Sequence, residues 1–505
     1  MACVGGASGN TAMGSLSSGI PVKYTVPTMN TATLATFALY LLAMLSLGII
    51  AWRATESLPD YILGGRRLGA AVTALSAGAS DMSGWLLLGL PGAFYASGLN
   101  QIWIVFGLIL GALANWHFVA ARLRHYSEKA NDSLTIPDFL ENRFQDKSRM
   151  LRLISALAIL LFFTFYVSSG MVSGALLFEK SFGLPYTTAL LVGSFVIVSY
   201  TFLGGYLAVC WTDFFQGLLM LLALVITPLV VIGELGGWSA TIETIERVKP
   251  NALDSFHETG FLAIVSLMAW GLGYFGQPHI LARFMGISST EEVRKAKYIG
   301  MSWMIVSMMG AMLIGLTGIA WYDSNPIENS ETIMILLTQV LFNPWIAGVL
   351  LAAILAAIMS TIDSQLLVSS SAVAEDLYRG FIRRDASQKE LVWVSRLAVA
   401  GVAVVAGVLA MNPDSSVLDL VGYAWAGFGA TFGPLILLSL TWSKTTRNGA
   451  LAGMLVGAAT VVIWGSLKGG IFDLYELAPG FVFSALAIVI VSRLAQEPGV
   501  GSEEV

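Results

Sequence analysis

The residues of this chain that could do chemistry are polar side chains set inside long apolar segments. The clearest is Asp81, which lies in ALSAGASDMSGWLLLGLPG (74–92) between Ser80 and Ser83 and among three glycines. A carboxylate within an apolar segment long enough to cross a membrane is costly unless it is paired or faces water. Serine and glycine favour local unwinding of a helix, and the carbonyls freed in this way can bind ions. The alternative is an aspartate that hydrogen-bonds to neighbouring serines and only packs.

A second segment joins an aromatic pair to a helix-breaking sequence. Trp270 and Tyr274, in SLMAWGLGYFGQPHILARFMG (266–286), are four residues apart, so an α-helix would place them on one face. Three glycines lead into Pro278, which removes a backbone donor and interrupts the helix. Such a pair beside a break suits a small cationic or amphipathic ligand. Without the break, the same pair would more often face lipid or the core.

A third segment, AAIMSTIDSQLL, carries small and hydroxyl-bearing residues along one helix face. The spacing i, i+3, i+4 and i+7 aligns four of them: Ala357, Ser360, Thr361 and Ser364. Hydroxyl and carbonyl oxygens are the ligands that hard cations such as sodium prefer. Asp363 lies close to this stripe. The alternative is hydrogen bonding of each hydroxyl to the carbonyl four residues before it, which needs no ligand.

Two further charged positions have simpler explanations. Asp213 begins a predicted span, where the helix dipole alone favours an acidic residue, and a role in sodium coupling is the alternative. Arg66 and Arg67 precede the Asp81 segment, and we expect them to anchor the membrane boundary, with gating as the alternative. The four histidines and two cysteines show no metal-ligand spacing, so we expect no transition metal, no organic cofactor and no enzyme.

The whole composition requires these residues to be held in a membrane. Of 505 residues, 56% are hydrophobic and 12% charged, with a mean hydropathy of +0.75, whereas soluble domains carry about 25% charged residues. A net charge of −5 without a basic stripe excludes a nucleic-acid binder. The apolar runs do not alternate, which excludes a transmembrane β-barrel. The chain is therefore predicted to be an all-α polytopic membrane protein in a lipid bilayer.

The apolar runs define thirteen predicted membrane-spanning helices. They lie near residues 31–52, 68–98, 102–121, 151–178, 185–203, 206–234, 260–285, 298–322, 343–370, 391–411, 416–442, 448–467 and 474–494. They form one domain over 31–495, between an N-terminal tail (1–30) and a short C-terminal tail (496–505). Met29 stands just before the first span. One hypothesis is therefore that the natural protein starts at Met29 and that the residues before it are a start-site artefact.

The positive charges predict the orientation of these helices. We assign 22 of the 27 lysine and arginine residues, Arg283 among them, to loops on the side of the C-terminus. The positive-inside rule then places the C-terminus in the cytoplasm and the N-terminus outside. The two interrupted spans lie five helices apart and so cross in opposite directions. That pattern predicts inverted five-helix repeats, near 68–234 and 260–442, with a binding site at the membrane midplane.

These motifs resemble the sodium/solute symporter family. The likeness is carried by DYILGGRRLG, TALSAGASDMSGWLL, GYFGQPHILARFM, FNPWIAG, AAIMSTIDSQLL, ASQKELVWV and YAWAGFGATFGP, and it runs from about residue 33 to 495. Within the family, the motifs match the bacterial branch that takes up L-proline rather than the sugar or pantothenate transporters. The resemblance therefore implies sodium-coupled uptake of L-proline across the cytoplasmic (inner) membrane, with no obligate protein partner.

The resemblance also implies roles for particular residues. Sodium would lie between the second and ninth spans, on the carbonyls of Ala79, Met82 and Ala357 and the hydroxyls of Ser360 and Thr361. Sodium coupling would involve Asp81, Ser83, Asp363 and Asp213. The proline pocket would be formed by Trp85, Gly89, Tyr166, Trp270 and Tyr274, with Arg66 and Pro278 in gating and helix orientation. Two features depart from the family pattern: Asp363, where serine is expected, and the first 28 residues.

Other functions are alternatives to sodium-coupled uptake of L-proline. Another small amino or carboxylic acid could be the substrate of the same sodium-coupled mechanism. A non-transporting sensor would carry a soluble signalling module, and only about ten residues follow the last span. A channel fits paired broken helices less well than alternating access does.

Overall fold

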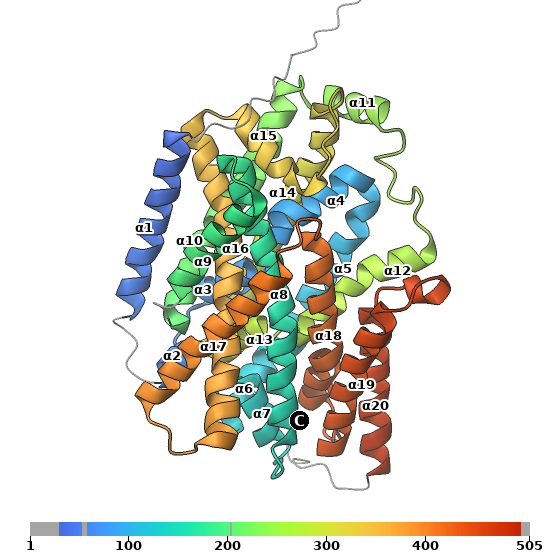
Figure 1. The fold of residues 1–505 in the computed structure, drawn as a ribbon. Helices are drawn as coiled ribbons and strands as arrows, with labels where there is room; N and C mark the ends of the chain where they lie inside the picture. Colours follow the sequence, from blue (N-terminus) through green and yellow to red (C-terminus); the bar gives the residue numbers. More distant parts are fainter. Residues whose placement is uncertain (1–29, 53–57, 202–204, 496–505) are drawn as a thin grey trace, which may run out of the picture.

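The computed structural model describes residues 30–52, 58–201 and 205–495, and the regular elements among them are helices. Within these ranges the β-type contact is an isolated parallel bridge between Leu68 and Ile287. The predicted tails and the Met29 hypothesis lie outside the described residues, apart from Asn30. The helices stand side by side in one bundle, with α1 at one edge and α19 and α20 at the other (Figure 1).

Each predicted span overlaps one helix or one broken pair of helices. In order these are α1 (Thr31–Trp52), α3 with α4 (Ala70–Asp81, Leu90–Ser97), α5 with α6 (Ile102–Asn115, Ala121–Lys129), α8 (Met150–Phe182), α9 (Tyr186–Thr201), α10 (Tyr206–Glu234), α12 with α13 (Phe261–Ala269, Pro278–Gly286), α14 (Thr290–Trp321), α16 (Pro344–Ser371), α17 (Gln388–Leu409), α18 (Val417–Thr441), α19 (Arg447–Gly465) and α20 (Leu477–Leu494). The remaining α-helices are short or amphipathic: α2 (Leu58–Leu63), α7 (Ile136–Arg143), α11 (Trp238–Val248) and α15 (Ile333–Leu341).

Length and hydropathy support most of these spans individually. Ten of the described helices are long and apolar enough to cross a bilayer, and the bent pair of α12 and α13 makes eleven. The other two predicted spans correspond to the broken α3–α4 segment and to α9, which has 16 residues. The number thirteen therefore stays a prediction.

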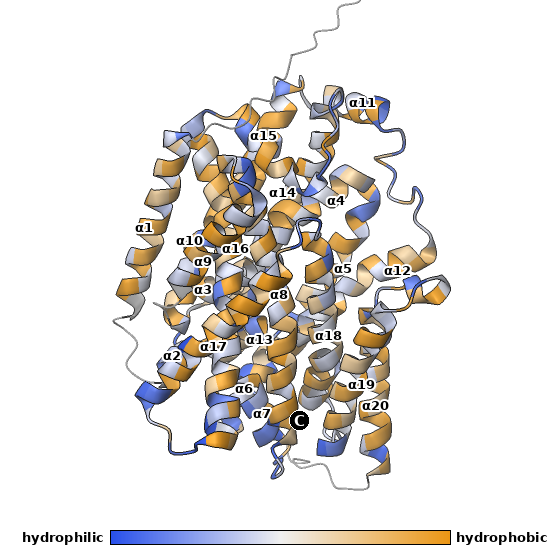
Figure 2. Ribbon diagram, viewed as in Figure 1, coloured by the Kyte–Doolittle hydropathy of each residue, from blue (hydrophilic) through white to orange (hydrophobic). Residues whose placement is uncertain are grey.

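The bundle has a buried centre and a lipid-compatible periphery. In the apolar stretches of α16 and α18, 83% of residues are buried, against 28% in α17 and 33% in α1. The outer helices expose large apolar side chains, such as Leu39, Phe195 and Leu397. Apolar residues accordingly cover the middle of the molecule, and hydrophilic ones gather towards its two ends (Figure 2). The central helices are therefore where a polar side chain is best shielded from lipid and water.

Glycines allow the closest helix contact near the centre. A Cβ atom on Gly111 of α5 would lie 2.0 Å from the carbonyl oxygen of Gly271, and one on Gly107 would lie 2.4 Å from that of Met268. Only glycine permits backbones to meet this closely, which confirms the packing role expected of small residues in membrane helices.

Candidate functional site

The α3–α4 span is broken directly after Asp81. Met82 has φ −90° and ψ 78°, outside the helical region, and a π-helical turn, η2 (Trp85–Gly89), then leads into α4. Asp81, Met82 and Ser83 are all buried. The predicted interruption at the serine and glycine residues is thus confirmed, and it places an acidic side chain in the interior of the bundle.

Asp81 accepts hydrogen bonds from three of the residues predicted to form the proline pocket. Trp85 Nε1 and the Tyr166 hydroxyl each donate to the Asp81 carbonyl oxygen at 3.1 Å. The Tyr274 hydroxyl donates to Asp81 Oδ2 at 2.6 Å. Segments distant in the sequence therefore converge on one residue, where a carbonyl oxygen and a carboxylate face a wall of aromatic rings.

The α12–α13 span is also broken, but its local geometry differs from the expectation. Trp270 and Tyr274 lie in η5 (Trp270–Gly276), a 3₁₀ helix, and α13 begins at Pro278 after a 45° bend. In a 3₁₀ helix residues three apart are aligned, so the prediction that this pair shares a helix face was wrong. Trp270 instead stacks on Tyr475, with ring centroids 5.2 Å apart.

Trp425 of α18 joins the two aromatic residues that η5 separates. Its indole nitrogen donates to the Trp270 carbonyl oxygen at 2.7 Å, and its ring meets Tyr274 edge-on at 5.1 Å. A Cβ on Gly273 would lie 1.8 Å from that indole nitrogen, so this glycine is required for the contact. Trp425 is not among the predicted site residues, although the motif that contains it, YAWAGFGATFGP, is one of those that carry the family resemblance.

An oxygen cluster lies between α3 and α16, as the sodium prediction requires. The Ala79 carbonyl oxygen accepts from the Ser360 hydroxyl at 2.8 Å and from the Thr361 hydroxyl at 3.3 Å. Ser360 also donates to the Ala357 carbonyl oxygen at 3.1 Å. Four of the five predicted sodium ligands therefore meet through hydrogen bonds that cross two helices. The fifth is the carbonyl of Met82, a residue that is buried next to Asp81 where α3 ends.

Asp213 does not lie at the start of its helix, as was predicted. It is seven residues beyond the start of α10, fully buried, and 3.1 Å from Arg283 Nη2, which is also fully buried. Arg283 lies on α13 rather than in a loop, so its assignment to a cytoplasmic loop was wrong. The guanidinium also reaches Ser364 Oγ at 2.5 Å, which directs that member of the stripe away from the Ala79 cluster.

The remaining acidic candidate, Asp363, is buried on α16 and interacts electrostatically with Tyr40 of α1. The Tyr40 hydroxyl in turn accepts from Gln216 Nε2 at 2.8 Å. Asp363 is thus on the helix that carries Ser360 and within electrostatic range of Tyr40 on α1.

A large cavity opens at the α4 end of the broken span. It has a volume of about 420 Å³, and Gly89 forms part of its wall together with residues that precede α18. Glu331, from η6 (Ser330–Thr332), closes one side by accepting backbone N–H bonds from Val417 at 3.0 Å and Leu418 at 3.1 Å. A Cβ on Gly89 would lie 3.3 Å from Leu418, so a larger residue would narrow the cavity.

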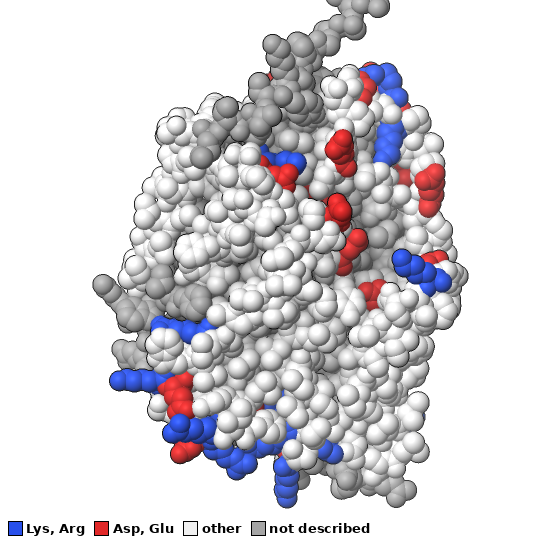
Figure 3. Space-filling model, in the orientation of Figure 1, with Lys and Arg blue, Asp and Glu red and all other residues white. Residues whose placement is uncertain are grey.

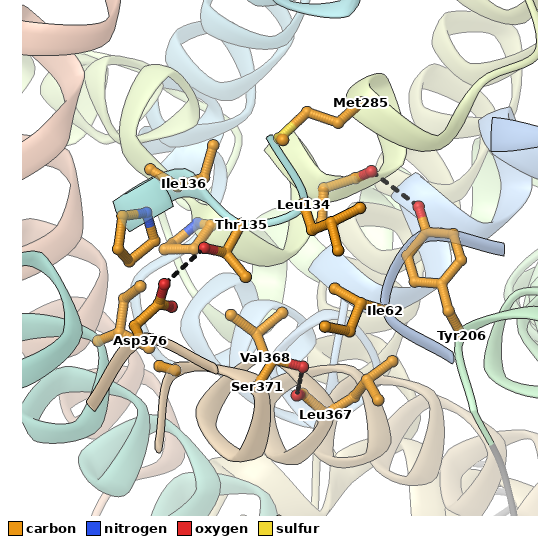
Figure 4. A pocket seen from close by; sticks show the side chains of 15 residues that line it. Ile62, Leu134, Thr135, Ile136, Tyr206, Met285, Leu367, Val368, Ser371 and Asp376 are labelled. Atoms are coloured by element: carbon orange, nitrogen blue, oxygen red, sulfur yellow. Dashed lines mark hydrogen bonds between the residues drawn. The ribbon is translucent and has the colours of Figure 1, made fainter. Parts of the chain in front are cut away.

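The opposite end of the broken helices contains a much smaller cavity, of about 30 Å³. In Figure 4, Ile62, Val368 and Leu367 form apolar walls, while Asp376 meets Thr135 across the cavity at 2.9 Å. Pro278 also lines this cavity. Arg66 lies at the same end, where it donates to Asp132 (2.9 Å) and to the carbonyl oxygens of Ser133 (2.9 Å) and Met285 (2.7 Å).

Two broken helices around a cluster of carbonyl, hydroxyl and carboxylate oxygens define a secondary transporter. A solved structure of a Na⁺-coupled sialic acid symporter, described as substrate-bound and outward-open, has the same fold with a TM-score of 0.78. It is 20% identical, covering 92% of this chain and 98% of that one. The transporter Mhp1 aligns less closely, with a TM-score of 0.53 at 12% identity, over 87% of this chain and 96% of its own.

The family model for "Sodium:solute symporter family" matches residues 61–457. A "Sodium/proline symporter" of Salmonella typhimurium is 55% identical over 482 residues, covering 94% of this chain and 96% of that protein. A "High-affinity proline transporter" of Bacillus subtilis is 57% identical over 458 residues, with 90% and 96% covered. This chain belongs to the sodium:solute symporter family.

Proposed function

We propose that this protein is a secondary active transporter that couples inward sodium movement to uptake of L-proline by alternating access. The observation that carries the proposal is the convergence of Trp85, Tyr166 and Tyr274 on Asp81, beside the oxygen cluster of Ala79 and Ser360. The names of relatives at 50–57% identity support proline as the substrate.

The sodium ion would bind where α3 meets α16. Its ligands would be the carbonyls of Ala79, Met82 and Ala357 with the hydroxyls of Ser360 and Thr361, whose hydroxyl protons would turn away from the ion. Oxygen ligands without formal charge suit a monovalent cation. Ser83, Asp213 and Asp363 would influence coupling through the helices that carry the site rather than as direct ligands.

Proline would bind on the outer side of Asp81. It is a zwitterion with an apolar ring, and the ring would pack on the aromatic wall of Trp85, Tyr166, Trp270 and Tyr274. Gly89 would leave room for entry from the outer cavity. Arg66 and Pro278, which lie at the inner end of the broken helices, would take part in opening the inner side.

We further propose two inverted repeats, over about 68–234 and 260–442, in a protein of the bacterial cytoplasmic membrane with its N-terminus outside. The paired breaks at Met82 and Gln277 support the repeat, since each interrupts the first span of a five-span unit. On the face in Figure 3, lysine and arginine side chains crowd the lower rim, the end at which α6 and α7 lie, which supports a cytoplasmic location for that end.

The test is uptake of labelled proline into proteoliposomes that contain the purified protein. We expect uptake under an inward sodium gradient, and little under equal gradients of potassium or protons. Competition by an excess of other unlabelled amino acids measures selectivity. Uptake that does not respond to sodium would refute the coupling, and uptake of a different solute alone would refute the assignment of proline.

A further inference from the structure

The loop between α19 and α20 lies beside α12, at the edge of the bundle (Figure 1). It contains a short 3₁₀ helix, η8 (Gly470–Asp473), and Tyr475 follows that helix just before α20 begins. This loop lies outside both proposed repeats, the second of which ends near residue 442. The repeats alone therefore do not account for a contact between the loop and the broken span of α12 and α13.

Tyr475 is fixed both at its main chain and at its hydroxyl group. Its N–H donates to Ser266 Oγ of α12 at 3.0 Å, and its hydroxyl donates to the Gly422 carbonyl oxygen of α18 at 2.6 Å. The loop itself is joined to α19, because Trp464 Nε1 donates to the Leu474 carbonyl oxygen at 3.0 Å. Three helices thus hold the phenol ring in one orientation.

The Tyr475 ring covers one face of the Trp270 indole. The two rings are nearly parallel, at 19°, with their centroids 5.2 Å apart. The edge of the indole lies against Gly422, where a Cβ would be 3.3 Å from two of the indole carbon atoms. Trp270 is 8% exposed, and its carbonyl oxygen accepts from Trp425. A tilt of the indole towards the loop therefore requires Tyr475 to move.

A second contact joins the start of α20 to the same segment, η5. Phe481 of α20 meets Phe275 of η5, with ring centroids 6.2 Å apart. A Cβ on Gly429 of α18 would lie 2.6 Å from Leu477 Cδ1 and 2.8 Å from Gly273 Cα, so a glycine stands where α20 and η5 approach each other. The segment that carries the aromatic wall is thus supported along its length by the last helix of the bundle.

We propose that Tyr475 is a positioning residue for substrate specificity and that it acts through Trp270. The inference rests on the proposed function, in which Trp270 forms one wall of the proline pocket. Because Tyr475 takes one face of the indole, the proline ring packs on the opposite face, and the stack fixes the width of the pocket. A solute with a larger ring, such as pipecolate, the six-membered homologue of proline, would need the indole to tilt, and Tyr475 resists that tilt.

The experiment measures binding of labelled L-proline, and its competition by pipecolate, to the full-length protein in lipid nanodiscs at saturating sodium. For Tyr475→Ala we expect proline affinity weakened about 3- to 10-fold and the ratio of the two affinities shifted towards pipecolate. Tyr475→Phe keeps the ring and should keep both affinities. Phe472→Ala is the matched control, because it removes a ring of the same loop that contacts Trp464 instead of Trp270.

Trp270→Ala and the variant with both substitutions separate this inference from the proposed pocket. Since Tyr475 acts through Trp270, we expect the double variant to bind proline no more weakly than Trp270→Ala alone. Additive losses would overturn the inference. It would also be overturned if Trp270→Ala weakens proline binding while Tyr475→Ala leaves it unaltered or weakens both solutes equally. An unaltered proline affinity in Trp270→Ala would instead refute the proposed pocket.

Gly422→Ala tests the same contact if Tyr475→Ala fails to fold. Its Cβ would press on the edge of the Trp270 indole, whose face is held by Tyr475. We expect a severalfold loss of proline affinity, with unchanged binding of sodium measured without proline. Gly401→Ala, whose Cβ would meet nothing within 4 Å, is the control. Equal proline affinities in the two glycine variants would contradict the proposal.

Discussion

The main chain and the side chain of Asp81 meet different neighbours. Its carbonyl oxygen accepts hydrogen bonds from Trp85 and Tyr166, while its carboxylate accepts one from the Tyr274 hydroxyl. One residue therefore joins the aromatic wall to the proposed sodium site. Changes at this position should affect sodium dependence before they affect stability.

Replacing Asp81 with asparagine keeps the size of the side chain and removes its charge. Loss of a charge-assisted contact of about 1.5–3 kcal/mol should raise the sodium concentration for half-maximal proline uptake roughly 10- to 100-fold. Uptake kinetics at varied sodium measure this. Asp385→Asn, at a position whose side chain is 88% exposed, serves as the control. Unchanged sodium dependence in the Asp81 variant would exclude Asp81 from coupling.

Trp270 should act on proline rather than on sodium. Its ring stacks on Tyr475 and its carbonyl holds Trp425, so Trp270→Ala removes one wall of the proposed pocket. Loss of one aromatic contact of about 1–2 kcal/mol predicts a proline affinity weakened about 5- to 30-fold. Trp345→Ala, at a position 60% exposed, is the comparison in the same binding assay. Equal proline affinities in the two variants would remove Trp270 from the pocket.

The sequence predicted which polar residues lie in the spans better than it predicted which side chains they contact. Asp81, Ser360 and Thr361 could be found because polar residues are conspicuous in apolar spans. Arg283 was assigned to a loop with the other positive charges on the side of the C-terminus, whereas its salt bridge with Asp213 allows it to be fully buried on α13.

At the scale of helices, the two breaks were predictable and their detailed form was not. Glycine and proline mark where hydrogen bonding stops, but whether the chain next forms an α, 3₁₀ or π turn depends on packing. The π turn at Trp85 and the 3₁₀ helix from Trp270 are both set by neighbouring elements, such as Trp425 of α18. The shared-face prediction for Trp270 and Tyr274 failed for this reason.

Contacts between helices at the end of the bundle that carries α7 centre on Arg152 of α8. It contacts Asp376 at 2.8 Å, Glu141 at 3.1 Å and Asp138 at 3.4 Å, and so joins α7 to the π-helical segment η7 (Ala372–Ile382) that extends α16. This cluster was missed because the sequence analysis assigned Arg152 to a loop. Its position beside the small inner cavity indicates that it holds that end of the molecule together.

Arg152→Ala would leave the buried carboxylate of Asp376 without the guanidinium that lies 2.8 Å from it. Removing one partner from a buried ion pair costs about 3–5 kcal/mol, so we expect a clearly lower melting temperature for the purified protein. Arg383→Ala, at a more exposed ion pair, should leave the melting temperature unchanged. A melting temperature of the Arg152 variant equal to that of the Arg383 variant would show that the cluster does not stabilise this end.

At the scale of the molecule, the cavity beside Gly89 and the cavity beside Asp376 differ in volume by more than tenfold, about 420 Å³ against about 30 Å³. The broken helices lie between them, and the larger cavity is at the end that carries Gly89 and Glu331. Alternating access requires the reverse arrangement to exist as well, and sodium can favour one of them only by binding it more tightly.

The central claim is that proline moves against its gradient because sodium moves with its own. The most direct measurement is proline accumulation in proteoliposomes with equal sodium on both sides and an imposed potential of −100 mV inside. Each sodium ion then supplies about 2.3 kcal/mol, enough for roughly 50-fold accumulation. We predict accumulation that approaches or exceeds this ratio with sodium and vanishes without it. Internal proline that never exceeds the external concentration would contradict sodium-coupled transport.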